Sequence, residues 1–355
     1  MKLSATFPAS SIVRRHRRRR ILRYIGLLSL ISLGRGAPAQ NVMVLVGAGS
    51  SVPTPLYNRW AQEYNKRSSG LQMRYLTVGT SEGIKQISHG AGDFAAGEAQ
   101  LTEAERKEGS LIELPVAIIA IVPVYNLPSL HRELRLSGEV LAEIFLGNIK
   151  TWNAPPIAKL NPEIDLPDLA IEVVNRPAGK GTNYVFTDFL SKSSSRFRAQ
   201  VGVTPSPKWP VGTPAERSSD MVDKVKSIPG SIGFVEYQYA VKNNIPQAVV
   251  LNRAGKNIRA SAESVAAACR AAEAPRWKDF SASLINTAGA DSYPITSFSW
   301  IYLRTSSSDA THAAALRNLL DWIYTEGQQF AVQEGYASLP PPLLDALREK
   351  IKSLH

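Results

Sequence analysis

The chain has 355 residues, one cysteine and a formal net charge of +11. A single cysteine excludes any disulfide within the chain, so a large apolar core must hold the fold together. Nine Lys or Arg and no acidic residue fall in residues 1–39, which leaves a net charge of +2 for the remainder. The high pI therefore gives no support to a nucleic-acid-binding protein.

Residues 1–39 have the layout of a secretory signal peptide. A basic region at 14–20 precedes an apolar run at 24–34, which is too short to span a membrane. Ala37-Pro38-Ala39 is an A-x-A cleavage signal, which makes Gln40 the expected new N-terminus. No cysteine at that site can carry a lipid, so we expect export to the periplasm by the Sec or the twin-arginine route. The alternative is a cytosolic protein with a basic tail.

The next segments alternate strands, glycine-rich loops and helices. Residues 42–46 are rich in valine and predict a buried strand, and 72–78 predict a second one. Leu56, Trp60 and Tyr64 recur every four residues, as on one face of a helix. Each strand leads into a Gly-rich loop, and a further helix is expected from residue 84. This order predicts an open α/β sheet that binds ligands at the carboxyl ends of its strands.

Two longer apolar runs predict crossings between two lobes. Residues 114–125 are too short and too interrupted by proline for a membrane span, and 293–303 form the matching return. A strand at 171–174 lies between them in the sequence. Two crossings imply a hinge and a cleft. Residues 343–351 predict a surface helix that closes the first lobe.

Three loops place glycine and hydroxyl residues directly before a helical stretch. They are residues 47–53, 79–83 and 176–182. Free backbone N–H groups and the helix dipole converge at such positions, which makes each a potential anion site. One loop alone fits an ordinary turn or helix cap equally well. Three loops, with Arg176 in the third, predict a pocket that surrounds a small oxyanion.

The motifs carry a family resemblance. Pro-Gly-Ser-Ile-Gly-Phe-Val-Glu-Tyr at 229–237 and Tyr-Pro-Ile-Thr at 293–296 are its most specific parts. Other matching segments are 47–55, 79–87, 93–99, 144–152, 158–162, 208–212 and 336–340. In these segments the chain resembles the periplasmic phosphate-binding proteins of the phosphate ABC importer.

The resemblance implies a type II periplasmic-binding-protein fold with two α/β lobes and a hinge of two crossing segments. The expected boundaries are 40–118 plus 294–355 for lobe I and 119–293 for lobe II. It also implies a monomer that captures inorganic phosphate and delivers it to an ABC permease complex in the inner membrane. No catalysis, cofactor, metal or nucleic acid is expected.

The resemblance assigns roles to residues in all three loops. Ser50, Ser51 and Val52 match positions that offer backbone N–H groups and one hydroxyl, and Ser81 matches a hydroxyl donor. Arg176 matches the arginine that pairs with phosphate oxygens, which a planar guanidinium can do with two hydrogen bonds.

The helix start and one acid complete the implied site. Gly181 and Thr182 match donors at the start of a helix. Glu98 matches a carboxylate that accepts a hydrogen bond from a protonated phosphate oxygen and repels sulfate, which has no proton to give.

Four positions depart from the family pattern. Glu98 and Ala178 stand where an Asp is usual, Lys180 where a Ser is usual, and Val52 where a Phe is usual. The charges at 98, 176, 178 and 180 sum to +1 here against −1 in the family.

Three hypotheses follow from these departures. In one, Lys180 pairs with Glu98 or the anion and phosphate remains the ligand. In another, the pocket takes a larger or more highly charged anion, such as a phosphonate, pyrophosphate or an organic phosphate. In the third, the Lys180 side chain turns to solvent and only its N–H is used.

Other classes of function stay open. A receptor that senses the anion without transport would have the same pocket. A secreted phosphohydrolase could use Ser51 or Ser81 with Glu98 and His89, although nothing positions that histidine as a base. No two histidines have metal-ligand spacing. Cys269 lies in an alanine-rich helical stretch and is expected to be a small buried residue.

Overall fold

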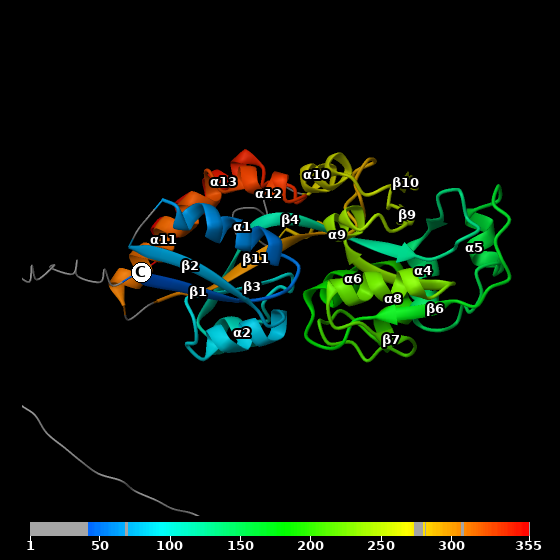
Figure 1. Cartoon of the computed structure of the whole chain (residues 1–355), viewed down its shortest axis with the longest axis horizontal. Coiled ribbons are helices and arrows are strands. Elements are labelled where there is room, and N and C mark those ends of the chain that lie inside the picture. Colours follow the sequence, from blue (N-terminus) through cyan, green and yellow to red (C-terminus); the bar gives the residue numbers. More distant parts are fainter. Residues whose placement is uncertain (1–41, 68–69, 273–279, 281, 307–308, 355) are drawn as a thin grey trace, which may run out of the picture. The chain divides into compact units, whose positions relative to one another are not determined.

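An eight-stranded sheet organises the molecule, in the order β2-β1-β3-β11-β4-β8-β6-β7 (Figure 1). The computed structural model describes residues 42–67, 70–272, 280, 282–306 and 309–354. The predicted signal peptide lies outside these ranges. A second sheet of three strands has the order β10-β9-β5.

The strands are β1 (Met43–Gly49), β2 (Leu71–Thr77), β3 (Phe94–Gly97), β4 (Leu111–Tyr125), β5 (Arg135–Leu136), β6 (Glu172–Asn175), β7 (Thr213–Pro214), β8 (Ser231–Glu236), β9 (Val249–Leu251), β10 (Asn257–Ile258) and β11 (Thr296–Arg304). The helices are α1 (Thr54–Asn65), α2 (Thr80–Ser88), α3 (Glu103–Glu108), α4 (Gly138–Phe145), α5 (Pro155–Leu160), α6 (Gly181–Ser193), α7 (Ser195–Gln200), α8 (Ser218–Ser227), α9 (Tyr237–Lys242), α10 (Ala262–Ala271), α11 (Ala310–Tyr324), α12 (Gln328–Gln333) and α13 (Pro341–Lys352).

The first strands and helices confirm the predicted α/β pattern. β1 pairs in parallel with both β2 and β3. Leu56, Trp60 and Tyr64 are buried on one face of α1, as their spacing predicts. In Figure 1, α1, α12 and α13 lie along one side of β1 and β2, and α2 lies along the other. Both faces of these strands are therefore covered, as the apolar run in β1 requires.

Two boundaries differ from the prediction. β1 extends to Gly49, into the segment expected to be a loop, because its last residues pair with Phe94, Ala95 and Ala96 of β3. A β-carbon at Gly47 would overlap the ring of Phe94, so glycine permits this close pairing. α2 begins at Thr80, four residues before the predicted start at 84. The second loop is therefore largely the first turn of a helix.

β4 is the strand that crosses between the two parts of the sheet. It pairs with β11 up to Ala120 and with β8 from Ile121 onward, antiparallel in both cases. The returning segment meets it at the same point, because the Ile121 N–H donates to the carbonyl of Ile295 (3.0 Å). We define the first half of the sheet as β2, β1, β3, β11 and residues 111–120, and the second half as residues 121–125, β8, β6 and β7. The lobe boundaries themselves stay a prediction.

Aromatic side chains pack the core beside the strands of the second half. The rings of Phe186 on α6 and Phe234 on β8 stack with centroids 4.2 Å apart. Phe145 and Trp209 contact Phe234 from α4 and from the loop before β7. Such rings each bury a large apolar area. The cluster therefore fixes α6 and β8, whose ends carry site residues.

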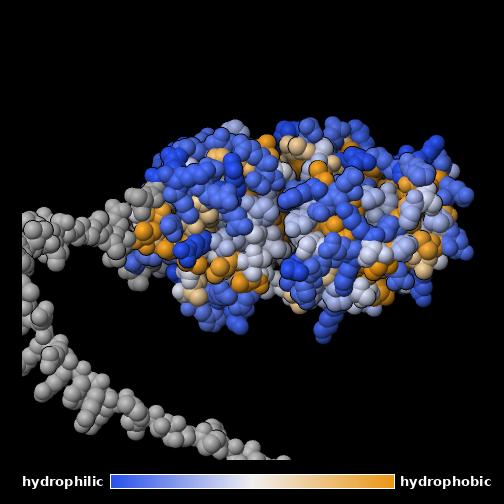
Figure 2. Space-filling view, viewed as in Figure 1, coloured by the Kyte–Doolittle hydropathy of each residue, from blue (hydrophilic) through white to orange (hydrophobic). Residues whose placement is uncertain are grey.

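Three further predictions concern a surface helix, the single cysteine and membrane spans. α13 buries Leu343, Leu347 and Ile351 against the body of the protein, which confirms the predicted surface helix. Cys269 is buried on α10, and burial raises the pKa of its thiol to about 12, so it is a packing residue. Figure 2 shows hydrophilic residues over most of the visible face. No helix of the described residues is long and apolar enough to cross a bilayer.

Candidate anion-binding site

The three predicted loops lie against one another. The N–H groups of Val78 and Gly79 donate to the carbonyl of Gly49 (2.9 and 2.8 Å), which joins the second loop to the first. The N–H of Ser81 donates to the carbonyl of Gly179 (3.3 Å), which joins the second loop to the third. These bonds connect segments from both halves of the sheet, so the predicted anion site is one place rather than three.

Gly181 is the point of closest approach between the halves. It is the first residue of α6, and a β-carbon there would overlap Oε2 of Glu98 and lie 2.6 Å from Oγ1 of Thr80. Only glycine lets the start of α6 reach the end of β3 this closely. The free N–H groups and positive dipole end of α6 therefore meet the carboxyl group of Glu98.

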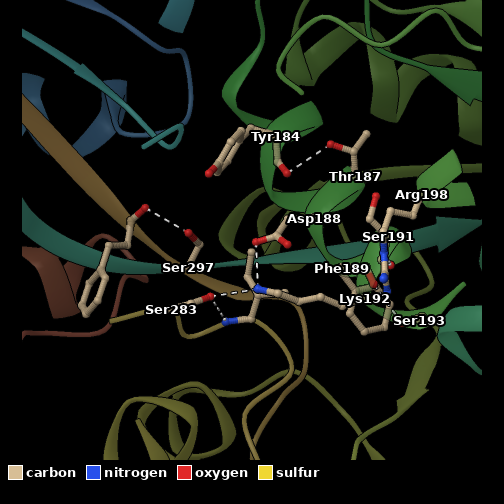
Figure 3. A network of polar contacts seen from close by, with 12 residues as sticks. Tyr184, Thr187, Asp188, Phe189, Ser191, Lys192, Ser193, Arg198, Ser283 and Ser297 are labelled. Atoms are coloured by element: carbon tan, nitrogen blue, oxygen red, sulfur yellow. Dashed lines mark hydrogen bonds and ion pairs between the residues drawn. The ribbon is translucent and has the colours of Figure 1, made fainter. Parts of the chain in front are cut away.

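Polar contacts along α6 hold that helix in place. Nζ of Lys192 lies 3.0 Å from Oδ2 of Asp188 and 3.1 Å from Oγ of Ser283, a residue distant in sequence (Figure 3). Oγ1 of Thr187 donates to the carbonyl of Thr204 (3.1 Å). These bonds tie the helix to two separate segments. They therefore position its N-terminus, although they do not touch the anion site.

Glu98 is fully buried and has no cation beside it. Hydroxyl groups surround its carboxyl: Oγ of Ser299 lies 3.3 Å from Oε1, Oγ1 of Thr80 lies 3.5 Å from Oε2, and Ser50 adds a third. No Lys or Arg nitrogen of the described residues lies within 4.0 Å. Burial raises the pKa of Glu98 to about 8; the Glu236 carboxylate adds to this and the three hydroxyls oppose it.

Arg176 is buried without a carboxylate partner. Its exposed fraction is 1%, and its Nε has no hydrogen-bond partner. In the described part of the chain no ion pair holds the guanidinium, although Trp209 Nε1 fixes the Arg176 carbonyl at 3.0 Å. Burial lowers the pKa of Arg176, and Glu236 is the carboxylate that most strongly opposes this. A buried cation in this condition is strongly destabilising unless an anion joins it.

Hydrogen bonds from Thr54, Tyr75 and Tyr336 hold the backbone of the first loop. Oγ of Ser50 accepts the N–H of Val52 (3.1 Å), and the Ser50 carbonyl accepts the hydroxyls of Thr54 (3.1 Å) and Tyr75 (2.8 Å). The hydroxyl of Tyr336 donates to the Val52 carbonyl (2.7 Å). Four bonds within one short segment make its backbone rigid.

The remaining predicted residues divide into two groups. Ser51 and Ser81 are partly exposed, whereas Thr182 is buried and its hydroxyl has no partner. Lys180, the N-cap residue of α6, is paired on the protein: its Nζ is 3.4 Å from Oε2 of Glu216, and its N–H donates to the carbonyl of Pro205 (3.2 Å). Thr182 therefore offers a free donor beside Gly181, and the Lys180 ammonium has a partner on the protein.

Sequence reasoning missed three residues of the site: Glu236, Thr80 and Ser299. Glu236 is 1% exposed, and Oγ of Ser218 donates to its Oε1 (2.9 Å), while its Oε2 has no partner. The signal for Glu236 was an acid at the end of a fully buried strand, because an acid in such a place is rare unless it has a role. Thr80 and Ser299 carried no such signal, since small hydroxyl residues occur throughout loops and strands.

The structure also bears on catalysis and metal binding. His89 lies at the other end of α2 from Ser81, about 12 Å away at ~1.5 Å per residue. Its ring Nδ1 contacts the carbonyl of Lys85 (2.7 Å), so it does not serve Ser81 as a base. Among the described residues no group of three or more His, Cys, Asp or Glu could hold a metal ion.

A sheet shared by two α/β halves, with three predicted anion-binding loops meeting between them, is typical of solute-binding proteins of the periplasmic type. The family model of the PBP superfamily domain matches residues 36–326. The chain therefore belongs to the PBP superfamily, and its predicted two-lobe fold is confirmed.

Curated relatives narrow the comparison. The chain is 36% identical to "Phosphate-binding protein PstS" of Xylella fastidiosa over 299 residues, which cover 84% of this chain and 82% of that protein. It is also 36% identical to the protein of the same name in Pasteurella multocida over 328 residues, 92% of this chain and 95% of that one.

Solved structures share the fold at lower identity. A phosphate-binding protein from Stenotrophomonas maltophilia has a TM-score of 0.65 and 18% identity, covering 86% of this chain and 93% of that one. A putative phosphate ABC transporter substrate-binding protein from Clostridium perfringens, with bound phosphate, has a TM-score of 0.60 and 17% identity. The match covers 84% of this chain and 100% of that chain.

Proposed function

We propose that this chain is a periplasmic solute-binding protein that captures inorganic phosphate and delivers it to an ABC permease complex in the inner membrane. The observation that carries the proposal is Arg176, a guanidinium that is 1% exposed and has no acidic partner among the described residues. A phosphate oxygen pair supplies the missing counter-charge in bidentate geometry. The names of the curated relatives support the same ligand.

The other donors would complete the coordination from both halves of the sheet. Gly181 and Thr182 offer N–H groups at the start of α6, and Thr182 adds its unpartnered hydroxyl. Ser51 and Ser81 contribute from the first half. Hydrogen bonds to a charged group are each worth about 1.5–3 kcal/mol, so several together can replace the hydration of a small anion.

Release and delivery follow from the same arrangement. The contact between Ser81 and Gly179 joins the halves, and an anion held by both stabilises the closed arrangement over an open one. The residue boundaries of the moving lobes are those expected at the hinge, 118/119 and 293/294. The protein acts as a monomer, in the periplasm, and without catalysis. The lack of catalysis fits the position of His89, which lies at the far end of α2 from Ser81.

Calorimetry on protein purified from the periplasm tests the proposal. Phosphate should bind with micromolar or tighter affinity, and Arg176→Lys should weaken it about 10- to 100-fold, because an ammonium cannot make the planar pair of bonds. Arg348→Lys is the matched control, since Arg348 is exposed and paired with Asp321 on the surface. Absence of phosphate binding at millimolar concentration would overturn the proposal.

A further inference from the structure

A cavity of about 520 Å³ lies beside the point where β4 passes from one half of the sheet to the other. The buried residues Ile118 and Ala120 of β4 line it, together with residues of α9, α10 and α12 (Figure 1). None of the residues assigned to the anion site lines it. Its volume falls in the range of ~300–1,000 Å³ that is typical of small-molecule sites.

Two valines make the mouth of this cavity apolar. Val241 on α9 is 54% exposed and Val332 on α12 is 59% exposed, and both line the cavity. They are the two most exposed of the large apolar side chains that the structure describes. Val265 of α10, which is buried, continues the apolar surface inside. An apolar molecule that covers this surface removes it from water, which favours binding.

Contacts among its walls give the cavity a defined shape. The N–H of Ile118 donates to the carbonyl of Ala337 (2.9 Å), and the N–H of Ala337 donates to the carbonyl of Ile118 (3.0 Å). The turn after α12 meets α9 closely, because a β-carbon at Gly335 would lie 2.9 Å from Cβ of Gln238. The hydroxyl of Tyr336 donates to a backbone carbonyl (2.7 Å), which fixes its ring. A ligand would therefore not have to order these walls on binding.

One polar group of the lining has unused hydrogen-bonding capacity. Nε2 of Gln238 is buried and has no hydrogen-bond partner among the described residues. The hydroxyl of Tyr336 interacts with the same side chain, but an amide nitrogen carries two N–H donors. At least one donor is therefore free. A buried donor without a partner is costly, and an acceptor atom on a ligand would remove that cost.

The charges along the cavity cancel. Of the described residues that line it, Lys242 and Glu334 are charged, one of each sign. A charged ligand would lose hydration and would meet one like charge for each opposite one. The lining therefore favours a neutral molecule, in contrast to the anion site with its buried Arg176.

We propose that this cavity is a second ligand site, which binds a small neutral aromatic molecule carrying one hydrogen-bond acceptor. The valines at the mouth cover the ligand, and Nε2 of Gln238 donates to its acceptor atom. An aromatic ring suits the cavity because Tyr237, Tyr239 and Tyr336 line it, and aromatic rings pair favourably with one another. The site is separate from the proposed phosphate site and takes a ligand of the opposite chemical character.

Fluorescence titration of the purified protein with Prodan, a neutral naphthalene that carries a ketone, tests the site. We expect saturable binding of one probe per chain in the micromolar range, with emission shifted to the blue by the apolar surroundings. Val332→Asp should weaken binding at least about 10-fold, because it places a charge on the apolar wall. Val42→Asp, at an exposed valine directly before β1, is the matched control and should bind like the wild type.

A further variant tests the hydrogen bond. Gln238→Met keeps a side chain of similar length and loses the donor, so it should weaken Prodan binding about 5-fold. Unchanged affinity in this variant would overturn the assignment of an acceptor-bearing ligand. Circular dichroism establishes that each variant is folded. If Gln238→Met does not fold, the comparison of Val332→Asp with Val42→Asp decides, since both valines are exposed and their replacement should leave the core intact.

The remaining outcomes do not depend on phosphate binding. Absence of saturable Prodan binding overturns the proposal and would leave the apolar mouth to a protein partner. Equal affinities in Val332→Asp and Val42→Asp also overturn it, because the probe would then bind elsewhere. Complete displacement of Prodan by saturating phosphate would place the probe in the anion site and overturn the proposal as well. Prodan binding that persists in Arg176→Lys supports a separate site.

Discussion

Replacing Glu98 by glutamine should remove much of the pH dependence of the folding stability between about pH 4.5 and 8. Burial, the largest cause, raises the pKa of Glu98 from 4.5 to about 8. Within this window the folded protein holds a proton that the unfolded chain releases. The free energy of unfolding therefore decreases as the pH rises through the window.

The size of the effect follows from the two pKa values. The interval from 4.5 to about 8, at ~1.36 kcal/mol per pH unit, corresponds to roughly 5 kcal/mol. This is an upper bound, because water that reaches the carboxyl group during local opening of the fold would stabilise its charged form. A loss of even half this size is a large fraction of the ~5–15 kcal/mol stability of a domain. Glutamine has nearly the same shape and no charge to bury, so it escapes the loss.

Urea unfolding at about pH 5 and about pH 8.5 measures the difference. The buffers must contain no phosphate or sulfate, because a bound anion would stabilise the folded state. The wild type and the control Glu172→Gln, at an exposed position on β6, should lose several kcal/mol more than Glu98→Gln over this range. Glu113 also has a pKa raised by burial, but it loses stability equally in all three proteins and cancels. Equal losses in all three would refute a buried, neutral Glu98.

Three further variants test the geometry of the site. Gly181→Ala should weaken phosphate binding at least about 100-fold in calorimetry, because the new β-carbon would overlap Oε2 of Glu98 and force the halves of the sheet apart. Gly70→Ala is the control and should bind phosphate normally, because the space around Gly70 is open. Trp209→Phe should cost about 1 kcal/mol in urea unfolding and weaken phosphate binding, because the Arg176 carbonyl loses its 3.0 Å hydrogen bond. Arg176→Met removes an unpaired buried cation, so it should raise the free energy of unfolding in anion-free buffer and abolish phosphate binding. A lower free energy of unfolding in this variant would show that the guanidinium has a stabilising partner on the protein.

Much of the fold could be predicted because its signals are local. The valine-rich run of β1 and the four-residue spacing of Leu56, Trp60 and Tyr64 report burial directly. The end of β1 could not be found in this way. Gly47-Ala48-Gly49 has the composition of a loop, and only its pairing with β3 makes it a strand.

The site was predictable in part for the same reason. Arg176 and the start of α6 are neighbours in sequence, and a Gly-rich loop before a helix indicates an anion site by itself. The contacts of Glu98 are not local: Ser299 lies 201 residues away in sequence. Likewise, the ion pair between Lys180 and Glu216 is set by the folded structure and not by their spacing in the sequence. Charge counting along the sequence cannot anticipate either pairing.

The charge at the site argues for a small oxyanion over a larger one. Positions 98, 176, 178 and 180 hold two cations and one acid, a formal sum of +1. The Lys180 ammonium lies 3.4 Å from Glu216, and burial raises the pKa of Glu98 to about 8. Among the described residues, Arg176 is then the one cation at the site without an ion-pair partner, and the nearby buried Glu236 offsets part of its charge.

A pyrophosphate or organic phosphate would bring two or more negative charges and additional oxygens into this dry space. Each extra charge would lose its hydration without a new cation, at a cost of several kcal/mol. One tetrahedral ion, shared among Arg176, the hydroxyl groups and the N-terminus of α6, satisfies the donors without that cost.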